Sequence, residues 1–151
     1  MNEPDTESPG TAPERRCFQR DKLIRFHHCD PAGIVFYPQY FVLFHELVED
    51  WFNYGLELGY AEFVAKQRLG LPMVHIDCDF LSPGKIGDTL QLSLAVKRIG
   101  RSSLRLLIEA NVKAIPTVRA TLTVVLVRVD SLRPVPITPD LRSRIEAFVA
   151  S

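Results

Sequence analysis

The sequence is poor in several features that would narrow its function. Its three cysteines, Cys17, Cys29 and Cys78, are too irregularly spaced for a disulfide framework or a zinc cage. Its 18 basic and 18 acidic side chains cancel, so the chain has no overall field to hold a nucleic acid or an anionic membrane. Its longest apolar run, TLTVVLV, is far short of a membrane span, and its first residues lack the apolar core of a signal peptide. We therefore expect a soluble, cytoplasmic protein with no nucleic-acid partner and no membrane partner.

The overall amino-acid composition is that of an ordinary globular domain. Hydrophobic residues make up 46% and charged residues 24% of the 151 positions, which suits a single core and excludes a multidomain machine. Residues 1–16 are rich in Pro, Glu, Thr and Ser and cannot bury apolar area, so we expect them to form a disordered tail. Residues 17–151 are expected to form the one domain.

A long helix is expected from Gln39 to Tyr54, with Pro38 at an early helix position. At about 100° per residue, the polar side chains of this run share an arc of roughly 140° and the apolar side chains, Trp51 among them, fill the rest. Only Val42 is out of place. An apolar arc this wide cannot be covered by one neighbouring helix, and a curved sheet would cover it.

Segments with the alternation of β-strands surround this helix. A first strand begins near Cys17 and is expected to end at Asp30, and later strands are expected over 73–80, 88–99, 103–114 and 117–130. The short RIGRSS segment predicts a hairpin between the second and third of these later strands. A short helix after the long one and a last helix capped at Thr138 complete the chain. This order predicts an α+β domain with one antiparallel sheet curled around one helix.

The loop ahead of the long helix, CDPAGIVFYPQY, is the most specific motif. It resembles the first-loop signature of hotdog-fold acyl-coenzyme A (CoA) thioesterases of the 4-hydroxybenzoyl-CoA thioesterase type. The segment LSPGKIGDTL supports the resemblance, which extends over about residues 18–148. It implies a single hotdog domain with an antiparallel sheet of about five strands around a long central helix. It also implies a homodimer, often paired into a homotetramer, that has its active sites at the subunit interface and needs no cofactor, since CoA is part of the substrate.

On this resemblance the catalytic groups are the Asp30 carboxylate and the backbone N–H of Tyr37. Amides at a helix start are fixed donors aimed at the negative charge that develops on a thioester oxygen. An aspartate is ionised at neutral pH and could attack the carbonyl as a nucleophile or act as a general base on water. Gly33 leaves space for the thioester to approach the loop backbone. Tyrosine at position 37, where related short-chain thioesterases have histidine, favours the branch that acts on aryl substrates.

The resemblance also implies substrate contacts elsewhere in the chain. Leu71 and Ile99 occupy positions that contact the acyl group in aryl-specific members, and because both are apolar, a group less polar than 4-hydroxybenzoyl is expected. The candidates for contact with the CoA phosphates are Arg98, Arg101, Ser102 and Arg128, near the hairpin and on the last strand. A charge run of this kind can also simply face water.

The assignment of Asp30 as the catalytic carboxylate has alternatives. Asp30 could only close a turn by accepting hydrogen bonds from loop amides. Glu46 and Glu49 on the helix could serve as the catalytic carboxylate, although we expect a solvated or intersubunit face there. The run from His27 to Asp30 holds potential metal ligands, but neighbours on an extended chain point to opposite faces, so no metal is expected.

Two other functions remain open on the same fold. One is a hydratase or dehydratase that acts on acyl thioesters, a reaction for which the family uses a histidine with a carboxylate on the helix. The other is a non-catalytic protein that binds acyl thioesters and in which Asp30 is only a turn residue. The function we expect is hydrolysis of an acyl- or aroyl-CoA to the free acid and CoA.

Overall fold

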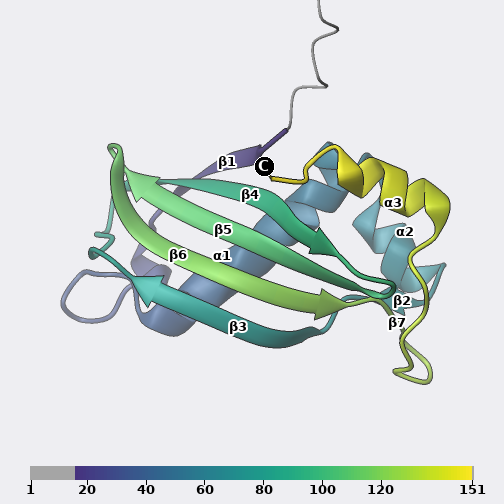
Figure 1. The fold of residues 1–151 in the computed structure, drawn as a ribbon. Helices are drawn as coiled ribbons and strands as arrows, with labels where there is room; N and C mark the ends of the chain where they lie inside the picture. Colours follow the sequence, from purple (N-terminus) through teal and green to yellow (C-terminus); the bar gives the residue numbers. More distant parts are fainter. Residues whose placement is uncertain (1–15, 151) are drawn as a thin grey trace, which may run out of the picture.

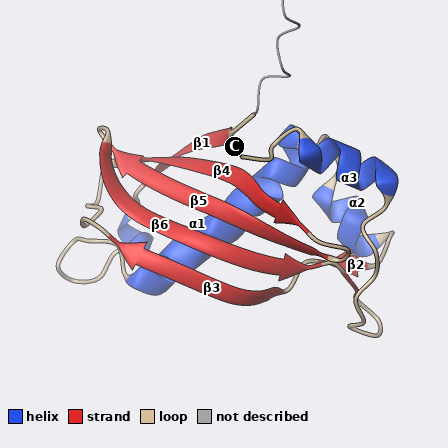
Figure 2. Ribbon diagram, in the orientation of Figure 1, coloured by secondary structure: helices blue, strands red, loops and turns tan. Residues whose placement is uncertain are grey.

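A single curved antiparallel sheet wraps around one long helix in the computed structural model, which describes residues 16–150 (Figure 1). Two shorter helices lie at one end of the sheet (Figure 2). In chain order the elements are β1 (Phe18–Leu23), the 3-10 turn η1 (Phe26–His28), α1 (Tyr37–Asp50), the π-helical turn η2 (Trp51–Gly55), α2 (Tyr60–Ala65), β2 (Leu69–Gly70), β3 (Met73–Phe80), β4 (Thr89–Ile99), β5 (Ser103–Val112), β6 (Ile115–Val125), β7 (Val127–Arg128) and α3 (Pro139–Glu146). The predicted α+β hotdog architecture is confirmed.

The central helix forms where the apolar arc predicted it. It begins at Tyr37, two residues earlier than expected, with Pro38 in its first turn, and η2 extends it to Gly55. Its inward side chains are almost fully buried, and Trp51 and Phe52 have no exposed surface. Val42, the residue outside the apolar arc, is half exposed.

The sheet has the strand order β1-β4-β5-β6-β3. Its concave face packs on α1 through alternate residues of β4, β5 and β6, all of them buried: Leu90, Leu92, Leu94, Val96, Leu104, Leu106, Ile108, Ala110, Val118, Ala120, Leu122 and Val124. Burial of each large aliphatic side chain contributes about 1.5–3 kcal/mol, so this face supplies a large part of the core. In contrast, β3 at the edge has no residue that is fully buried.

The largest differences from the expected strand boundaries are in the first and the last strand. The first strand ends at Leu23 and not at Asp30, because Ile24 bonds to the loop at Asp88 and the chain then turns through η1. The last predicted strand, 117–130, is divided between β6 and β7, and β7 leaves the main sheet to pair with β2.

The last helix begins as predicted, with Thr138 Oγ1 accepting the Leu141 N–H at 3.2 Å. At the opposite end of the chain, the backbone N–H of Arg16 bonds to Ala147 O at 3.0 Å. The predicted disordered tail otherwise lies outside the described residues and stays a prediction.

Candidate active site

The loop between η1 and α1 is a short two-stranded ribbon. Asp30 N–H donates to Ile34 O at 2.9 Å, and Phe36 N–H donates to His28 O at 2.9 Å. Between these two bonds, residues 29 and 35 form an antiparallel bridge. The ribbon fixes Asp30 at its tip, and its second strand leads directly into Tyr37, the first residue of α1.

One oxygen of the Asp30 carboxylate holds the tip of this ribbon. Oδ1 accepts the Ala32 N–H at 2.8 Å, and the Asp30 carbonyl accepts the Gly33 N–H at 2.9 Å. Gly33 has a φ of +77°, a left-handed conformation that glycine adopts without strain. Oδ2 accepts no hydrogen bond from the described residues, so the half-buried carboxylate keeps one oxygen for other chemistry. The turn role and a catalytic role are therefore compatible.

The first turn of α1 offers one free amide beside this loop. Pro38 has no N–H, and the N–H of Gln39 donates to Phe36 O at 2.8 Å. Among the described residues, the N–H of Tyr37 has no acceptor. Because a helix start carries partial positive charge, this amide is a suitable donor to an anionic oxygen.

A third segment, which follows β3, packs against the ribbon. Val35 N–H donates to Gly84 O, and Ile86 N–H donates to Gly33 O, both at 2.9 Å. A Cβ at Gly84 would lie 2.9 Å from the hydroxyl of Tyr40, so glycine is required for this close approach. The LSPGKIGDTL segment thus closes the back of the candidate site.

A cleft of about 320 Å³ lies between this segment and the start of α1. Its walls are mostly apolar, and Tyr37, Tyr40 and Phe80 supply aromatic rings. The Phe80 ring lies 6.4 Å from the Tyr37 ring and 5.8 Å from the Tyr40 ring between centroids. Burial raises the pKa of the Tyr40 phenol, so this side chain remains neutral. The cleft is suited to a flat, apolar acyl group.

The other predicted substrate contacts lie at the opposite end of the sheet. Phe80 pairs with Val118 at the Asp30 end of β6, whereas Met73 pairs with Val124 at the far end. Six residue steps along a strand span about 20 Å. Leu71 precedes Met73, and Ile99 lies on the far hairpin, so within one chain neither reaches Asp30.

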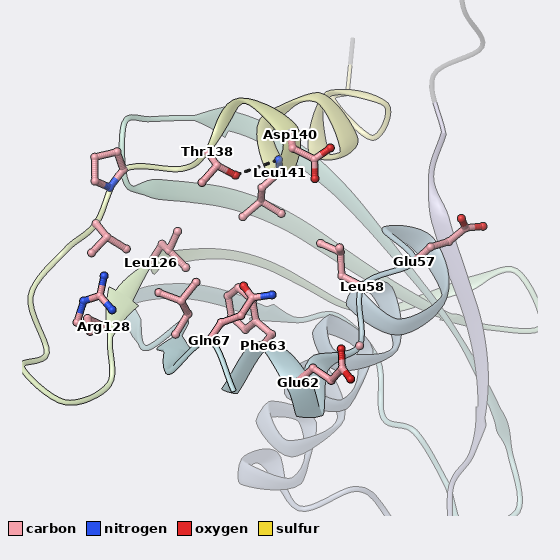
Figure 3. A pocket seen from close by; sticks show the side chains of 14 residues that line it. Glu57, Leu58, Glu62, Phe63, Gln67, Leu126, Arg128, Thr138, Asp140 and Leu141 are labelled. Atoms are coloured by element: carbon pink, nitrogen blue, oxygen red, sulfur yellow. Dashed lines mark hydrogen bonds between the residues drawn. The ribbon is translucent and has the colours of Figure 1, made fainter. Parts of the chain in front are cut away.

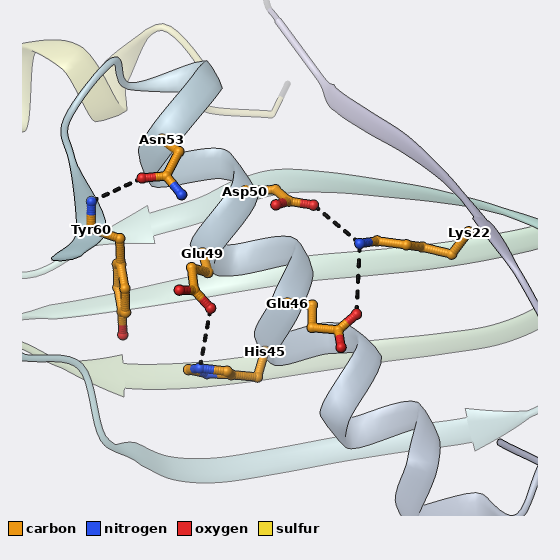
Figure 4. Close-up of polar contacts among 7 residues, drawn as sticks. All are labelled: Lys22, His45, Glu46, Glu49, Asp50, Asn53 and Tyr60. Carbon is orange, nitrogen blue, oxygen red and sulfur yellow. Dashed lines mark hydrogen bonds and ion pairs between the residues drawn. The ribbon is translucent and has the colours of Figure 1, made fainter. Parts of the chain in front are cut away.

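Leu71 lines a separate cavity of about 250 Å³ beneath the second half of α1. His45, Tyr60 and Met73 line it as well. His45 Nε2 lies 3.9 Å from a Glu49 oxygen, and its ring meets the Tyr60 ring at 6.2 Å (Figure 4). Burial raises the pKa of Tyr60, and the charge of Glu49 acts in the same direction.

The four candidates for CoA contact are gathered at this far end. Leu126 N–H donates to Ser102 O at 2.6 Å, which places the hairpin tip and the residues before Arg128 side by side. Arg101 lies on the same tip, and Arg98 projects from the exposed surface of β4. Arg128 lines a cavity of about 560 Å³ between α2, β7 and α3 (Figure 3). Carboxylates of Glu57, Glu62 and Asp140 stand around that cavity, a charge unfavourable to phosphates.

The helix carboxylates are engaged in ion pairs on the outer side of α1. Lys22 on β1 lies 3.6 Å from Glu46 and 3.3 Å from Asp50, and so ties the edge strand to the helix (Figure 4). Glu49 pairs with His45. This arrangement agrees with the expected solvated face. Asp30 is not among the residues that line the aromatic cleft, but its backbone N–H bonds to the carbonyl of Ile34, which does line it.

Two features of the site were missed in the sequence. One is the wall of the aromatic cleft made by Phe80 and Gly84. The strand alternation and the Pro-Gly dipeptide were the only sequence signals that pointed to these two residues. The other is His28, which is buried and whose Nδ1 accepts the Arg25 N–H at 2.9 Å. Within residues 16–150, no three His, Cys, Asp or Glu side chains gather as metal ligands would, and no helix is long and apolar enough to cross a membrane.

A long central helix wrapped by one five-stranded antiparallel sheet is the fold of the hotdog class of protein. Residues 24–145 match the family model of the thioesterase-like superfamily, and the chain belongs to that superfamily. The predicted family, fold and class of enzyme, a thioester hydrolase, are confirmed.

The relatives agree with this assignment, and the solved structures agree with the fold. A 1,4-dihydroxy-2-naphthoyl-CoA hydrolase from Nostoc punctiforme is 27% identical over 68% of this chain and 69% of its own length. One from Synechococcus elongatus is 33% identical over 58% of this chain and 65% of its own length. The chain therefore spans about two thirds of these relatives.

Among solved structures, a thioesterase superfamily protein from Jannaschia sp. CCS1 matches with a TM-score of 0.82 at 20% identity, over 100% of this chain and 99% of its own. A 1,4-dihydroxy-2-naphthoyl-CoA thioesterase from Synechocystis matches with a TM-score of 0.77 at 22% identity, over 86% and 96% of the two chains. At these identities the likeness shows the fold alone.

Proposed function

We propose that the protein hydrolyses an aroyl-CoA thioester to the free acid and CoA, with Asp30 and the Tyr37 N–H as the catalytic groups. The observation that carries this proposal is that a carboxylate with a free oxygen lies on the ribbon that leads into a free helix-start amide, and that this amide belongs to Tyr37, which lines an aromatic cleft. The names of the relatives support a CoA thioester as the substrate.

The Tyr37 N–H donates to the thioester oxygen and stabilises the negative charge that forms there during attack. Such a donor typically contributes about 3 kcal/mol to lowering the barrier. Because the amide belongs to the backbone, it is already oriented and needs no reorganisation during the reaction. The Tyr37 phenol takes no part in this step.

Asp30 supplies the attack in one of two ways. As a nucleophile, Oδ2 bonds to the carbonyl carbon, the C–S bond breaks, and the CoA thiolate leaves and takes a proton from water; a second water then hydrolyses the anhydride. As a general base, the carboxylate takes a proton from the attacking water, and the proton passes to the departing sulfur. The free Oδ2 serves either route.

The acyl group is proposed to be aromatic. Tyr37, Tyr40 and Phe80 present ring faces and edges to the cleft, and stacking against them favours a flat ring. The two curated relatives are named for a naphthoyl substrate, which agrees with this chemistry. Charged groups are absent from the cleft lining, so a ring with few polar substituents fits it best.

The predicted site residues that lie at opposite ends of the sheet in one chain would meet in a homodimer. β3 is an eight-residue edge strand with Val74, Phe80 and the following Leu81 exposed, and an unpaired edge of this kind favours pairing with another strand. Antiparallel pairing of β3 with its copy would place the Met73 end of one chain beside the Phe80 end of the other. Leu71 and the hairpin that carries Ile99 would then reach the aromatic cleft of the partner subunit. We also propose that two such dimers associate into a tetramer.

The hydratase alternative has one observation in its favour, the His45–Glu49 pair beside the Leu71 cavity. A single panel separates the alternatives: aroyl-CoA, straight-chain acyl-CoA and enoyl-CoA, each followed for thiol release and for loss of the enoyl absorbance. We expect thiol release that is fastest with aroyl-CoA. Loss of the enoyl signal without thiol would favour a hydratase, and binding without either change would favour a non-catalytic protein.

A further inference from the structure

The turn that precedes the Asp30 ribbon is closed by a side chain and not by the backbone alone. His28 Nδ1 accepts the N–H of Arg25 at 2.9 Å, and the His28 N–H donates to Arg25 O at 3.0 Å. These two bonds fix both ends of η1. Because Nδ1 accepts, the ring is neutral and carries its proton on Nε2.

The surroundings of His28 favour this neutral form. Burial lowers its pKa from the usual 6.5, and the positive charges of His27 and Arg25 in the same turn and of Lys22 on β1 act in the same direction. Glu46 on α1 opposes them. His28 is only 7% exposed, so water cannot readily replace its hydrogen bond.

His28 also belongs to the ribbon that carries the candidate catalytic groups. Its carbonyl accepts the Phe36 N–H, the last rung before Tyr37, and Asp30 lies two residues beyond it on the same strand. We therefore expect a change in the η1 turn to move the strand that holds Asp30 relative to the start of α1. Protonation of Nδ1 would produce such a change, since two N–H groups would then face each other.

We propose that His28 is a positioning residue that aligns Asp30 with the Tyr37 amide only while its imidazole is neutral, which makes the site sensitive to acid. This inference rests on the proposed function for its effect on the reaction. Its structural part is that protonation of His28 changes the conformation of the ribbon, and this part does not depend on catalysis.

The structural part is tested by nitrogen-15 and proton NMR of the wild-type protein during a pH titration. We expect the Nε2–H tautomer at pH 8, and we expect the amide signals of Ala32, Gly33 and Phe36 to shift with the same midpoint as the His28 ring. The Nδ1–H tautomer, or loop amides that do not follow His28, would overturn the proposal.

The kinetic part compares kcat/KM for an aroyl-CoA between pH 5 and 8. The wild type should lose activity as the pH falls through the pKa of His28, which lies below 6.5. In His28→Asn, Oδ1 can take the place of Nδ1 as acceptor and does not titrate, so this loss should move to the lower pH at which carboxylates protonate. His28→Phe leaves the Arg25 N–H unpaired and should lower kcat/KM about tenfold at every pH.

His27→Asn is the matched control, because it makes the same change one residue away on an exposed side chain. It should keep the acid loss and move it to higher pH, since the positive charge of His27 lowers the pKa of His28. A His28→Asn variant with the wild-type acid loss would overturn the proposal. Failure of the proposed function would give a different result. The loop amide signals would still shift with the midpoint of the His28 ring, but Asp30→Asn would keep the wild-type rate.

Discussion

The ring of Phe80, at the end of β3, meets the ring of Tyr37, at the start of α1, edge to face with centroids 6.4 Å apart. This contact joins the exposed edge of the sheet to the first turn of the central helix. Both side chains are about half exposed, at 52% and 57%, so a ligand or a second chain can reach them. The two rings therefore lie where the aromatic cleft borders β3, the edge strand that we propose pairs with a second chain.

Phe80→Ala should weaken the preference for aromatic acyl groups. Aromatic pairs contribute about 0.5–1.5 kcal/mol beyond area burial, so the ratio of kcat/KM for aroyl-CoA to that for straight-chain acyl-CoA should fall about three- to tenfold. Steady-state thiol release measures this ratio. Phe26→Ala, which removes an exposed ring with no aromatic contact, should leave the ratio unchanged. An unaltered ratio in Phe80→Ala would remove this residue from the acyl site.

Gly84→Ala should destabilise the protein. The new Cβ would lie 2.9 Å from both Tyr40 Oη and Ile24 Cδ1, and overpacking of this kind typically costs about 1–3 kcal/mol. Thermal unfolding followed by circular dichroism should show a lower Tm. Gly70→Ala is the control, because its Cβ would meet only valine methyl groups, at 3.5 Å or more. Equal Tm values for the two variants would contradict the close approach at Gly84.

Stability should fall on acidification because of His28. Its folded-state pKa lies below 6.5, so as the pH drops below 6.5 the unfolded chain takes up the proton before the folded protein does. The contribution is fully present above pH 6.5 and is lost as the pH falls through the folded pKa. Urea unfolding midpoints at several pH values should decline less in His28→Asn than in the wild type. Identical declines would contradict the buried, neutral state of this imidazole.

A shared site can be tested by complementation between inactive chains. Asp30→Asn removes the carboxylate, and Leu71→Arg blocks the far cavity. If each site takes Asp30 from one chain and Leu71 from the other, co-refolding equal amounts should restore about a quarter of the wild-type activity, because half of the dimers regain one site. Activity no higher than that of the two separate variants would contradict the interface placement.

The fold could be predicted because its signals are local and periodic. The apolar arc of the helix and the alternation in β4, β5 and β6 are direct consequences of one-sided burial, and each led to the observed element. The end of β1 could not be predicted, because it depends on a hydrogen bond between Ile24 and Asp88, far away in sequence. The break after β6 likewise depends on pairing of β7 with β2.

For the site, sequence placed Asp30 and Tyr37 on one loop because they are close in the chain. It could not show that Leu71 and Ile99 lie about 20 Å away along the sheet, since that follows from strand register. It also could not show that His28 is buried and bonded to Arg25, because an exposed and a buried histidine are identical in a sequence. Only the hydrogen bond to Arg25 and the burial distinguish them.

The proposed chemistry of Asp30 is tested most directly by single-turnover thiol release from an aroyl-CoA. Asp30→Asn keeps an oxygen that can accept the Ala32 N–H but loses the charge, so the rate should fall by at least about a hundredfold while the fold is kept. Asp21→Asn, the same change on exposed β1, should retain the wild-type rate. A wild-type rate in Asp30→Asn would contradict the account and move the chemistry to another carboxylate.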